Sequence, residues 1–318
     1  MTCICIWHVF VHGMNYKKMG NGVMPDDADM VLMCVLVPAV NCFMLISGYF
    51  GIRFSFDKML QFMLQAFFCF IIGTAVNYVV WDDFSLGRLK HIFPILTDQW
   101  WFLTIYFVIF MLSPVINKGI ESISKRQFAF IIIVLLAMNS FGQYVLSLSS
   151  GYSFQSLLII YLIGRYLRIY PLIMDRKRSI LIWAVSTAAL FVCLKLSILY
   201  HPKFAWHLLS YNNPLIIIQS VCVLHFVLSF PPKHSLIFIF AGAHCFAVYL
   251  ITEIFGLNIY SLLAELFSGN FLFGLTVVVG VEVVIMFIDY LQSNVSRRIR
   301  ERMAEFEVIK SLSTNLKA

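Results

Sequence analysis

The sequence predicts an all-α integral membrane protein, a polytopic helical bundle of about ten transmembrane helices. Composition is the first observation behind this prediction: of 318 residues, 61% are hydrophobic and only 12% are charged, whereas a soluble domain is about 25% charged. The second is a mean hydropathy of +0.87. The third is that the apolar residues gather in stretches close to the roughly 20 residues that cross a bilayer. Any chemistry must therefore take place within the bundle or at its edges.

Ten apolar segments follow one another along the chain. The first holds only about a dozen residues before the polar stretch that follows, which is too few to span a bilayer unaided. We therefore expect the first helix to be truncated in this chain. Residues 1–292 form one transmembrane domain, and residues 293–318, rich in Arg and Glu, form a charged cytoplasmic helix or tail. The segments lie near residues 1–13, 30–52, 59–80, 101–117, 127–147, 153–170, 179–199, 213–230, 235–256 and 267–291.

The distribution of basic residues predicts the orientation of these segments. Seventeen of the 23 Lys and Arg residues lie on the side that holds the C-terminal tail, five lie on the other side, and Lys195 falls inside a segment. Cytoplasmic loops carry the excess of Lys and Arg. The tail side is therefore expected to face the cytoplasm across a bacterial-type inner (plasma) membrane. An even number of spans then places both termini in the cytoplasm.

Several classes of site are disfavoured by the same residues. The net charge of +7 comes mainly from short loops between segments, so it indicates topology rather than a nucleic-acid surface. The eight Cys lie in or beside apolar segments, which gives no disulfide framework. No pair or cluster of Cys and His has zinc spacing. We therefore predict neither a metal site nor a nucleic-acid partner.

Two histidines in the first segment are the best pointer to function. His8 and His12 lie one helical turn apart and share one face of a helix. An imidazole in apolar surroundings is costly unless it has a partner or a function. His8 is either a general base that deprotonates a hydroxyl, or a structural residue hydrogen-bonded between helices. His12, nearer the outer end, is expected to position substrate or to lie at the interface.

For other polar residues, too, both a functional and a structural interpretation are open. Asn41 and Ser47 lie in an apolar segment, where they line a site or pack helices together. Arg53 and Lys58 follow that segment, and Arg165 ends a later one on the same side. These three bind the phosphates of an anionic ligand, or they serve topology alone.

Two further residues lie toward the outer face. Trp101 begins the fourth segment, where aromatic residues usually form an interfacial belt. Glu253 is a carboxylate near the outer end of the ninth segment. Its intramembrane position makes it a functional candidate, although a hydrogen bond between helices accounts for it equally well.

Taken in order, short motifs along the chain resemble the membrane-bound acyltransferase-3 family, which O-acetylates cell-surface polysaccharides and related acceptors. The resemblance covers essentially the whole chain. The motifs are Trp7-His8, Val11-His12-Gly13, Asn41 with Ile46-Ser47-Gly48-Tyr49-Phe50, Lys58, Trp100-Trp101-Phe102-Leu103, Tyr106, Leu112-Ser113-Pro114, Tyr161-Leu162-Ile163-Gly164-Arg165, Tyr211-Asn212-Asn213-Pro214 and Phe246-Ala247-Val248-Tyr249-Leu250-Ile251-Thr252-Glu253.

The resemblance implies a membrane-bound O-acyltransferase that takes its acyl group from cytoplasmic acyl-CoA, with acetyl-CoA as co-substrate. His8 matches the family's essential His. The expected partners are membrane lipid and a glycan or glycolipid acceptor. For the phosphates of the donor we expect Arg53, Lys58 and Arg165. The acceptor site is expected to be lined by His12, Asn41, Ser47, Trp101 and Glu253.

The chain departs from the family pattern at three positions. The family's Arg, eleven residues before His8, would fall before Met1. The second of two basic residues after the second helix is replaced by the uncharged Gln61, so a phosphate role for Lys58 is weakly supported. Thr252 stands where the family often has His. Two alternatives to an active enzyme therefore remain: a transporter or flippase of a lipid-linked sugar or small anion, and a catalytically impaired relative.

Overall fold

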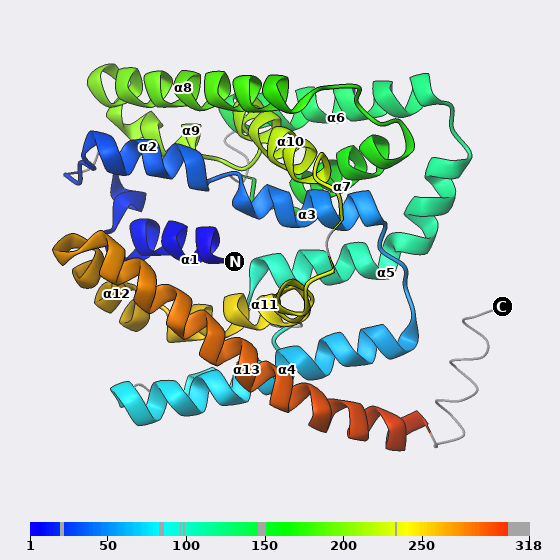
Figure 1. The fold of residues 1–318 in the computed structure, drawn as a ribbon, viewed down its shortest axis with the longest axis vertical. Coiled ribbons are helices and arrows are strands. Elements are labelled where there is room, and N and C mark those ends of the chain that lie inside the picture. The colour runs from blue at the N-terminus through cyan, green and yellow to red at the C-terminus, as the bar shows by residue number, and fades with distance from the viewer. Residues whose placement is uncertain are drawn as a thin grey trace. The chain divides into compact units, whose positions relative to one another are not determined.

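The computed structural model describes residues 1–19, 22–82, 86–95, 97, 99–145, 151–232 and 234–304. Most of them are helical, and no strand occurs among them beyond an isolated bridge between Met19 and Val23. The predicted all-helical class is therefore confirmed (Figure 1). The helices are α1 (Thr2–His8), η1 (Val9–Gly13), η2 (Tyr16–Lys18), α2 (Asp27–Leu36), α3 (Ala39–Phe50), α4 (Phe56–Trp81), η3 (Leu86–Ile92), α5 (Trp101–Glu121), α6 (Lys125–Val145), α7 (Phe154–Ile169), α8 (Arg176–Tyr200), η4 (Pro202–Phe204), α9 (Ala205–Leu208), α10 (Pro214–Leu228), α11 (Leu236–Phe255), α12 (Leu257–Gly269) and α13 (Phe271–Ala304).

Seven helical stretches in this described part of the chain are long and apolar enough to cross a membrane. The N-terminal stretch Thr2–Gly13 and α10 are apolar but shorter, and α7 has 16 residues. The expected number of about ten spans is thus not confirmed. The seven are Asp27–Phe50, Phe56–Trp81, Trp101–Glu121, Lys125–Gly142, Arg176–Tyr200, Leu236–Ile254 and Phe271–Met303.

The last two helices differ from the segment pattern. The sequence pattern treats residues 257–266 as a connection and starts the tenth segment at 267. In the structure, α12 occupies these residues and α13 begins only at Phe271. A second difference is that α13 runs without interruption past residue 292 to Ala304. The first residues of the predicted charged tail therefore continue the last membrane helix.

The chain divides into two compact units. The first contains Met1–Gly13, Arg53–Phe107 and His234–Ala318, and the second contains Met14–Ile52 and Val108–Lys233. In the first unit, α1 and η1 contact α11, α12 and α13, and α4 contacts α11 and α13 (Figure 1). The approach of η1 to α12 is close, since a Cβ on Gly13 would lie 2.2 Å from the backbone oxygen of Tyr260. Glycine at this position therefore lets the N-terminal segment reach α12.

In the second unit, α3 and α7 cross at two glycines. A Cβ on Gly48 would lie 2.2 Å from the backbone oxygen of Tyr161, and a Cβ on Gly164 would lie 2.4 Å from that of Leu45. Such distances are shorter than any real Cβ contact, so only glycine permits this approach. Close packing at small residues of this kind is typical of helices that associate in membranes.

Two prolines remove backbone hydrogen bonds from helical stretches of the second unit, and side chains supply other donors. Pro38 separates α2 from α3 and has no N–H for the carbonyl of Cys34, four residues earlier. The side-chain amide of Gln219 in α10 donates to that carbonyl at 3.4 Å. In α5, Pro114 leaves the carbonyl of Phe110 without its usual donor, and the hydroxyl of Ser113 donates to it at 2.8 Å. Such compensation is what a membrane interior requires of a broken helix.

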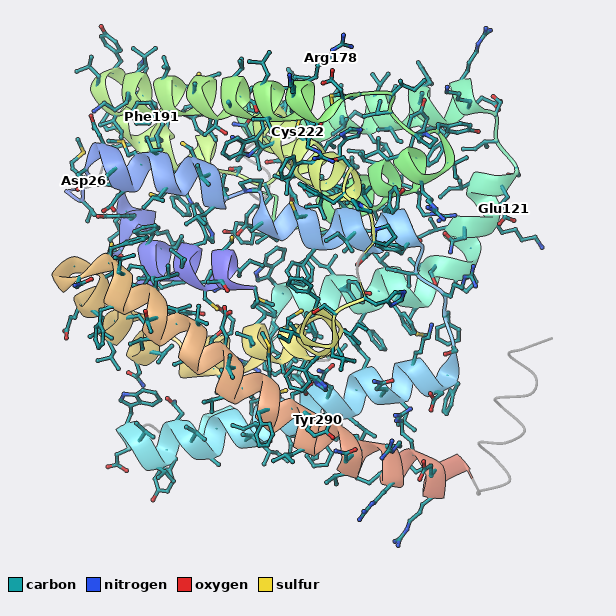
Figure 2. All side chains as sticks on the ribbon, in the orientation of Figure 1. Asp26, Glu121, Arg178, Phe191, Cys222 and Tyr290 are labelled. Carbon is teal, nitrogen blue, oxygen red and sulfur yellow. The ribbon has the colours of Figure 1, made fainter. Side chains whose placement is uncertain are left out.

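The outer surface of the helices is apolar. On α8, for example, the side chains of Leu181, Val185 and Leu199 are each about 60–70% exposed, whereas Arg178 projects from its first turn (Figure 2). Extended apolar surface of this kind marks a face that contacts membrane or another protein. Together with the seven long apolar helices, it identifies an integral membrane protein.

Candidate active site

Three side chains of the first unit meet at one ring nitrogen of His8. The Nδ1 atom lies 2.8 Å from Oε1 of Glu253, at the end of α11, and 3.0 Å from the hydroxyl of Tyr260 in α12. The Tyr260 hydroxyl in turn donates to the same Glu253 oxygen at 2.9 Å. α1, α11 and α12 thus each supply one member of a closed polar triangle.

This geometry fixes the tautomer of His8. An ionised carboxylate only accepts hydrogen bonds, and the single proton of the Tyr260 hydroxyl is already given to Glu253. Nδ1 must therefore carry a proton, and Nε2 then presents a lone pair. A carboxylate that holds Nδ1–H also favours the protonated ring that forms when Nε2 accepts a proton. Such an arrangement is chemically suited to a general base, and the catalytic role of His8 stays a prediction.

The site is enclosed but not sealed. The His8 side chain is 12% exposed and that of Glu253 is 25% exposed, so part of each side chain stays accessible. The neighbouring residues Trp7 and Tyr260 are almost completely buried. The ring of Tyr249 lies with its centroid 6.5 Å from that of His8. Aromatic packing therefore restricts the orientation of the imidazole.

His12 lies beside His8, as its spacing predicts. The two ring centroids are 5.5 Å apart, and the ring of His12 stacks on that of Tyr260 at 5.7 Å. The α-helix ends at His8, and the residues from Val9 to Gly13 form one turn of π-helix. Such turns are uncommon and often occur at functional sites. The π-turn brings both imidazoles against α12.

Of the other predicted site residues in the first unit, Glu253 joins His8 directly, in the way described above. Trp101 begins α5, is half-buried and meets the ring of Phe102 edge-on at 5.7 Å. Arg53 and Lys58 are exposed, and Lys58 lies in the first turn of α4, which Ser55 caps. The roles assigned to Trp101, Arg53 and Lys58 stay predictions.

Asn41 and Ser47 lie in the second unit and make hydrogen bonds within it. Asn41 is fully buried and donates to the backbone oxygen of Tyr211 at 2.8 Å, which ties α3 to the turn before α10. The hydroxyl of Ser47 donates to the backbone oxygen of Phe43 in its own helix at 3.0 Å. The bond of Ser47 accounts for its hydroxyl, whereas Oδ1 of Asn41 is buried without a hydrogen-bond partner among the described residues. The predicted contact of both side chains with substrate stays a prediction.

Arg165 lies where α3 ends. Its Nη1 would be 2.7 Å from a Cβ on Gly51, whose φ of +79° favours glycine, so the guanidinium lies against this turn. Both backbone groups of the next residue, Ile52, form hydrogen bonds with side chains. Its N–H donates to the Tyr161 hydroxyl at 3.3 Å, and its carbonyl accepts from Asn117 at 2.9 Å. Arg165 belongs to the second unit and Arg53 and Lys58 to the first, so their predicted convergence stays a prediction.

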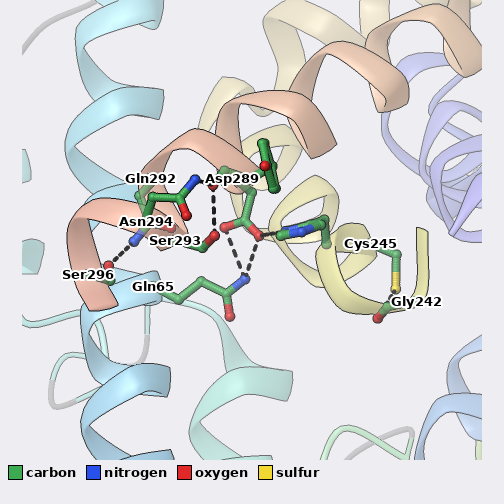
Figure 3. A network of polar contacts seen from close by, with 10 residues as sticks. Gln65, Gly242, Cys245, Asp289, Gln292, Ser293, Asn294 and Ser296 are labelled. Atoms are coloured by element: carbon green, nitrogen blue, oxygen red, sulfur yellow. Dashed lines mark hydrogen bonds and ion pairs between the residues drawn. The ribbon is translucent and has the colours of Figure 1, made fainter. Parts of the chain in front are cut away.

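Sequence reasoning missed one residue of the triangle and one whole network. Tyr260 was overlooked because α12 was not expected, although its apolar residues recur at helical spacing. The network joins Asp289 in α13 to His244 in α11 at 2.7 Å and to the amide of Gln65 in α4 at 3.1 and 3.2 Å (Figure 3). His244 and Asp289 are polar groups within apolar helices, and that was the available signal.

Among the described residues, no group of three or more His, Cys, Asp or Glu side chains is placed to hold a metal ion.

Comparison with protein families gives one match. A family model described as an acyltransferase domain, of acyltransferase family 3, matches residues 1–288. The matched region includes His8, Glu253 and Tyr260. No curated protein and no solved structure matches the chain.

Proposed function

The chain belongs to acyltransferase family 3, and we propose that it transfers an acyl group, in the simplest case acetyl, from acyl-CoA to a hydroxyl of a cell-surface polysaccharide or glycolipid. The observation that carries this proposal is the pairing of His8 Nδ1 with Glu253 at 2.8 Å. Acyl transfer to a hydroxyl needs a base that removes the hydroxyl proton. Among the groups at this site, a neutral imidazole held by a carboxylate is the one suited to that task.

His8 moves one proton during the proposed reaction. Its Nε2 accepts the hydroxyl proton as the acceptor oxygen forms a bond to the thioester carbonyl carbon. The imidazolium is stabilised by Glu253 while the carbon–sulfur bond breaks. His8 then returns the proton to the departing thiolate, so the products are an ester and a free thiol. Glu253 stays ionised throughout, and Tyr260 keeps its carboxylate oriented.

The proposed donor approaches from the cytoplasmic side of an inner (plasma) membrane, with both termini in the cytoplasm. Arg53, Lys58 and Arg165 are proposed to attract its phosphates, because guanidinium and ammonium groups form charge-assisted hydrogen bonds with phosphate oxygens. The proposed acceptor site includes His12, Trp101, Asn41 and Ser47.

Replacement of the base tests this function. In membranes containing the protein, we expect His8→Ala to lower transfer from labelled acetyl-CoA to a polysaccharide acceptor by about 10²–10⁴-fold, the usual contribution of a general base. His201→Ala is the matched control, since His201 is an exposed residue of the second unit. Equal insertion and thermal stability of both variants would show that the loss is chemical.

Two results would overturn the proposal. Transfer by His8→Ala at the rate of the unaltered protein would leave His8 as a packing residue. Transport of a labelled lipid-linked sugar, without any transfer of label from acetyl-CoA, would favour a transporter instead.

A further inference from the structure

A polar cavity of about 210 Å³ lies in the first unit, separate from the His8 triangle. Three helices form it: α4, α11 and the C-terminal half of α13. Most of its lining is polar, although it is built from helices of a membrane protein. The residues that matter here are Gln61, Gln65, His244, Asp289, Arg297 and Arg300.

The one carboxylate among the lining residues already accepts hydrogen bonds within the unit. Asp289 is 3% exposed and accepts hydrogen bonds from Nδ1 of His244 and from the amide of Gln65 (Figure 3). Both of its oxygens face donors, since the Gln65 amide lies within 3.2 Å of each. Asp289 is therefore poorly placed to bind a cation.

Arg297 and Arg300 have N–H groups that can donate further hydrogen bonds. Nη1 of Arg300 forms a two-pronged contact with Asp57, at 2.8 and 2.9 Å, but its Nε is buried and has no hydrogen-bond partner among the described residues. Nη2 of Arg297 reaches the side chain of Asn294 at 3.2 Å. A guanidinium carries five N–H groups, so both side chains have capacity for a further acceptor.

The cavity lies toward the end of a helix that is longer than a membrane is thick. The 34 residues of α13 extend over about 51 Å at 1.5 Å per residue, against a hydrocarbon core of about 30 Å. Asp289 lies about 27 Å along this helix from Phe271, and both arginines lie beyond it. Arg297 and Arg300 are therefore at the level of the headgroups or the adjoining water, where a soluble anion can enter the cavity.

We infer that this cavity binds a phosphate group, with Arg297 and Arg300 as its charged donors and the amides of Gln61 and Gln65 as neutral ones. An unpaired buried guanidinium N–H is costly, and phosphate offers several acceptor oxygens in a geometry that arginine matches. The phosphate can come from two sources. One is the nucleotide part of the acyl donor, which rests on the proposed function and makes this cavity an alternative to Arg53, Lys58 and Arg165 as the site of those phosphates. The other is the headgroup of an anionic phospholipid.

The course of α11 favours the acyl donor. The helix carries His244 at the cavity and Glu253 at the His8 triangle, nine residues apart, which corresponds to about 13 Å. One helix thus links the phosphate site to the proposed base. A donor anchored by its phosphates at this cavity would need its acyl-bearing arm to extend over a distance of this order to reach His8.

Binding of adenosine 3′,5′-bisphosphate to the full-length protein in neutral nanodiscs tests the first source. Titration calorimetry at low salt should show binding that Arg297→Gln and Arg300→Gln each weaken by at least about tenfold, the loss of one charge-assisted contact. Arg298→Gln is the matched control: it removes the same charge from the same helix, and Arg298, which is exposed like Arg297, does not line the cavity. We expect it to change the affinity less than twofold.

The second source needs nanodiscs that contain phosphatidylglycerol instead of phosphatidylcholine. If the phosphate is a lipid headgroup, this lipid should raise the melting temperature of the unaltered protein and of Arg298→Gln, but not of Arg297→Gln. Since Arg300→Gln also breaks the pair with Asp57, Arg300→Lys serves as its second variant. If neither probe discriminates Arg297 and Arg300 from Arg298, the inference is wrong.

Acyl transfer, measured separately, distinguishes this inference from the proposed function. If Arg297→Gln raises the KM for acetyl-CoA and leaves kcat unchanged, the cavity holds the donor. If transfer proceeds with an unchanged KM in Arg297→Gln, the donor is not held here, although the proposed function stands. Phosphate binding without any acyl transfer would leave the cavity assignment intact and remove the proposed function.

Discussion

His8 is tied to Glu253 and Tyr260 through one nitrogen, so each partner is expected to affect the reaction by a different amount. Glu253→Gln replaces an acceptor with an amide that can donate, which favours the wrong tautomer of His8. We expect transfer to fall by about 10²–10⁴-fold, as for loss of the base itself. Initial rates with labelled acetyl-CoA over a range of pH measure this. An unaltered rate and pH profile would show that Glu253 does not orient His8.

Tyr260→Phe removes only the hydroxyl and keeps the ring that stacks on His12. One hydrogen bond to a charged group contributes about 1.5–3 kcal/mol, so a loss of roughly ten- to a hundredfold in kcat is expected, with the KM for acetyl-CoA unchanged. The double variant Glu253→Gln, Tyr260→Phe should be little slower than Glu253→Gln alone, because both act through His8. A fully multiplicative loss would contradict a shared role.

At the scale of residues, the sequence indicated which polar side chains are costly in an apolar segment, but not which groups they contact. His8 was predicted because an imidazole in an apolar segment needs a reason to be there. Glu253 was singled out for the same reason, yet its contact with His8 depends on which helices are neighbours, and periodicity does not contain that information. Tyr260 gave no signal of its own, since a tyrosine is ordinary in a membrane helix.

At the scale of the elements, the crossing of α3 and α7 depends on the absence of two side chains. Gly48→Ala would place a Cβ 2.2 Å from the backbone oxygen of Tyr161, so the helices must separate. Overpacking of this kind costs about 1–3 kcal/mol, and we expect a clear drop in melting temperature in detergent. Gly119→Ala, in α5, is the control, because a Cβ there meets nothing within 4 Å. Equal melting temperatures for the two variants would show that α3 and α7 do not pack this closely.

The break at Pro38 makes a second prediction for the elements. Gln219→Leu removes the donor to the Cys34 carbonyl and the bond to Thr187 at 2.9 Å. An unsatisfied buried carbonyl costs about 1–3 kcal/mol. In a Pro38→Ala background the new N–H can serve Cys34, so the same substitution should cost less. A double-mutant cycle of melting temperatures measures this coupling, and strict additivity would rule it out.

At the scale of the molecule, the distribution of Lys and Arg predicts which side faces the cytoplasm. Reporter fusions after Ala318 should be active only as cytoplasmic reporters, and an inserted tag at the exposed Gly87 should be accessible from outside intact cells. The physical reason is that 17 of the 23 basic residues lie on one side. An externally accessible C-terminus would reverse the predicted topology.

The class of the molecule was predictable because composition alone decides it, whereas the number of spans was not. Hydropathy marks where apolar residues gather, but a 16-residue helix such as α7 and a helix joined across Pro38 give similar signals to a complete span. Likewise, α12 was missed because its residues 257–266 fall between two apolar segments and its last residues were assigned to the tenth segment. Which helices pack together depends on side-chain shape over long sequence separations, and hydropathy does not record it.

The first unit is assembled from three distant segments of the chain, and this has a consequence for biosynthesis. His8 is made at the start, whereas Tyr260 follows 252 residues later. At a synthesis rate of 5–20 residues per second, roughly 13–50 s pass between the synthesis of His8 and that of Tyr260. Until then the imidazole depends on water, lipid headgroups or the insertion machinery for hydrogen bonds. The proposed active centre is therefore completed only by the last helices to be synthesised, and a chain that stops at residue 233 never acquires it.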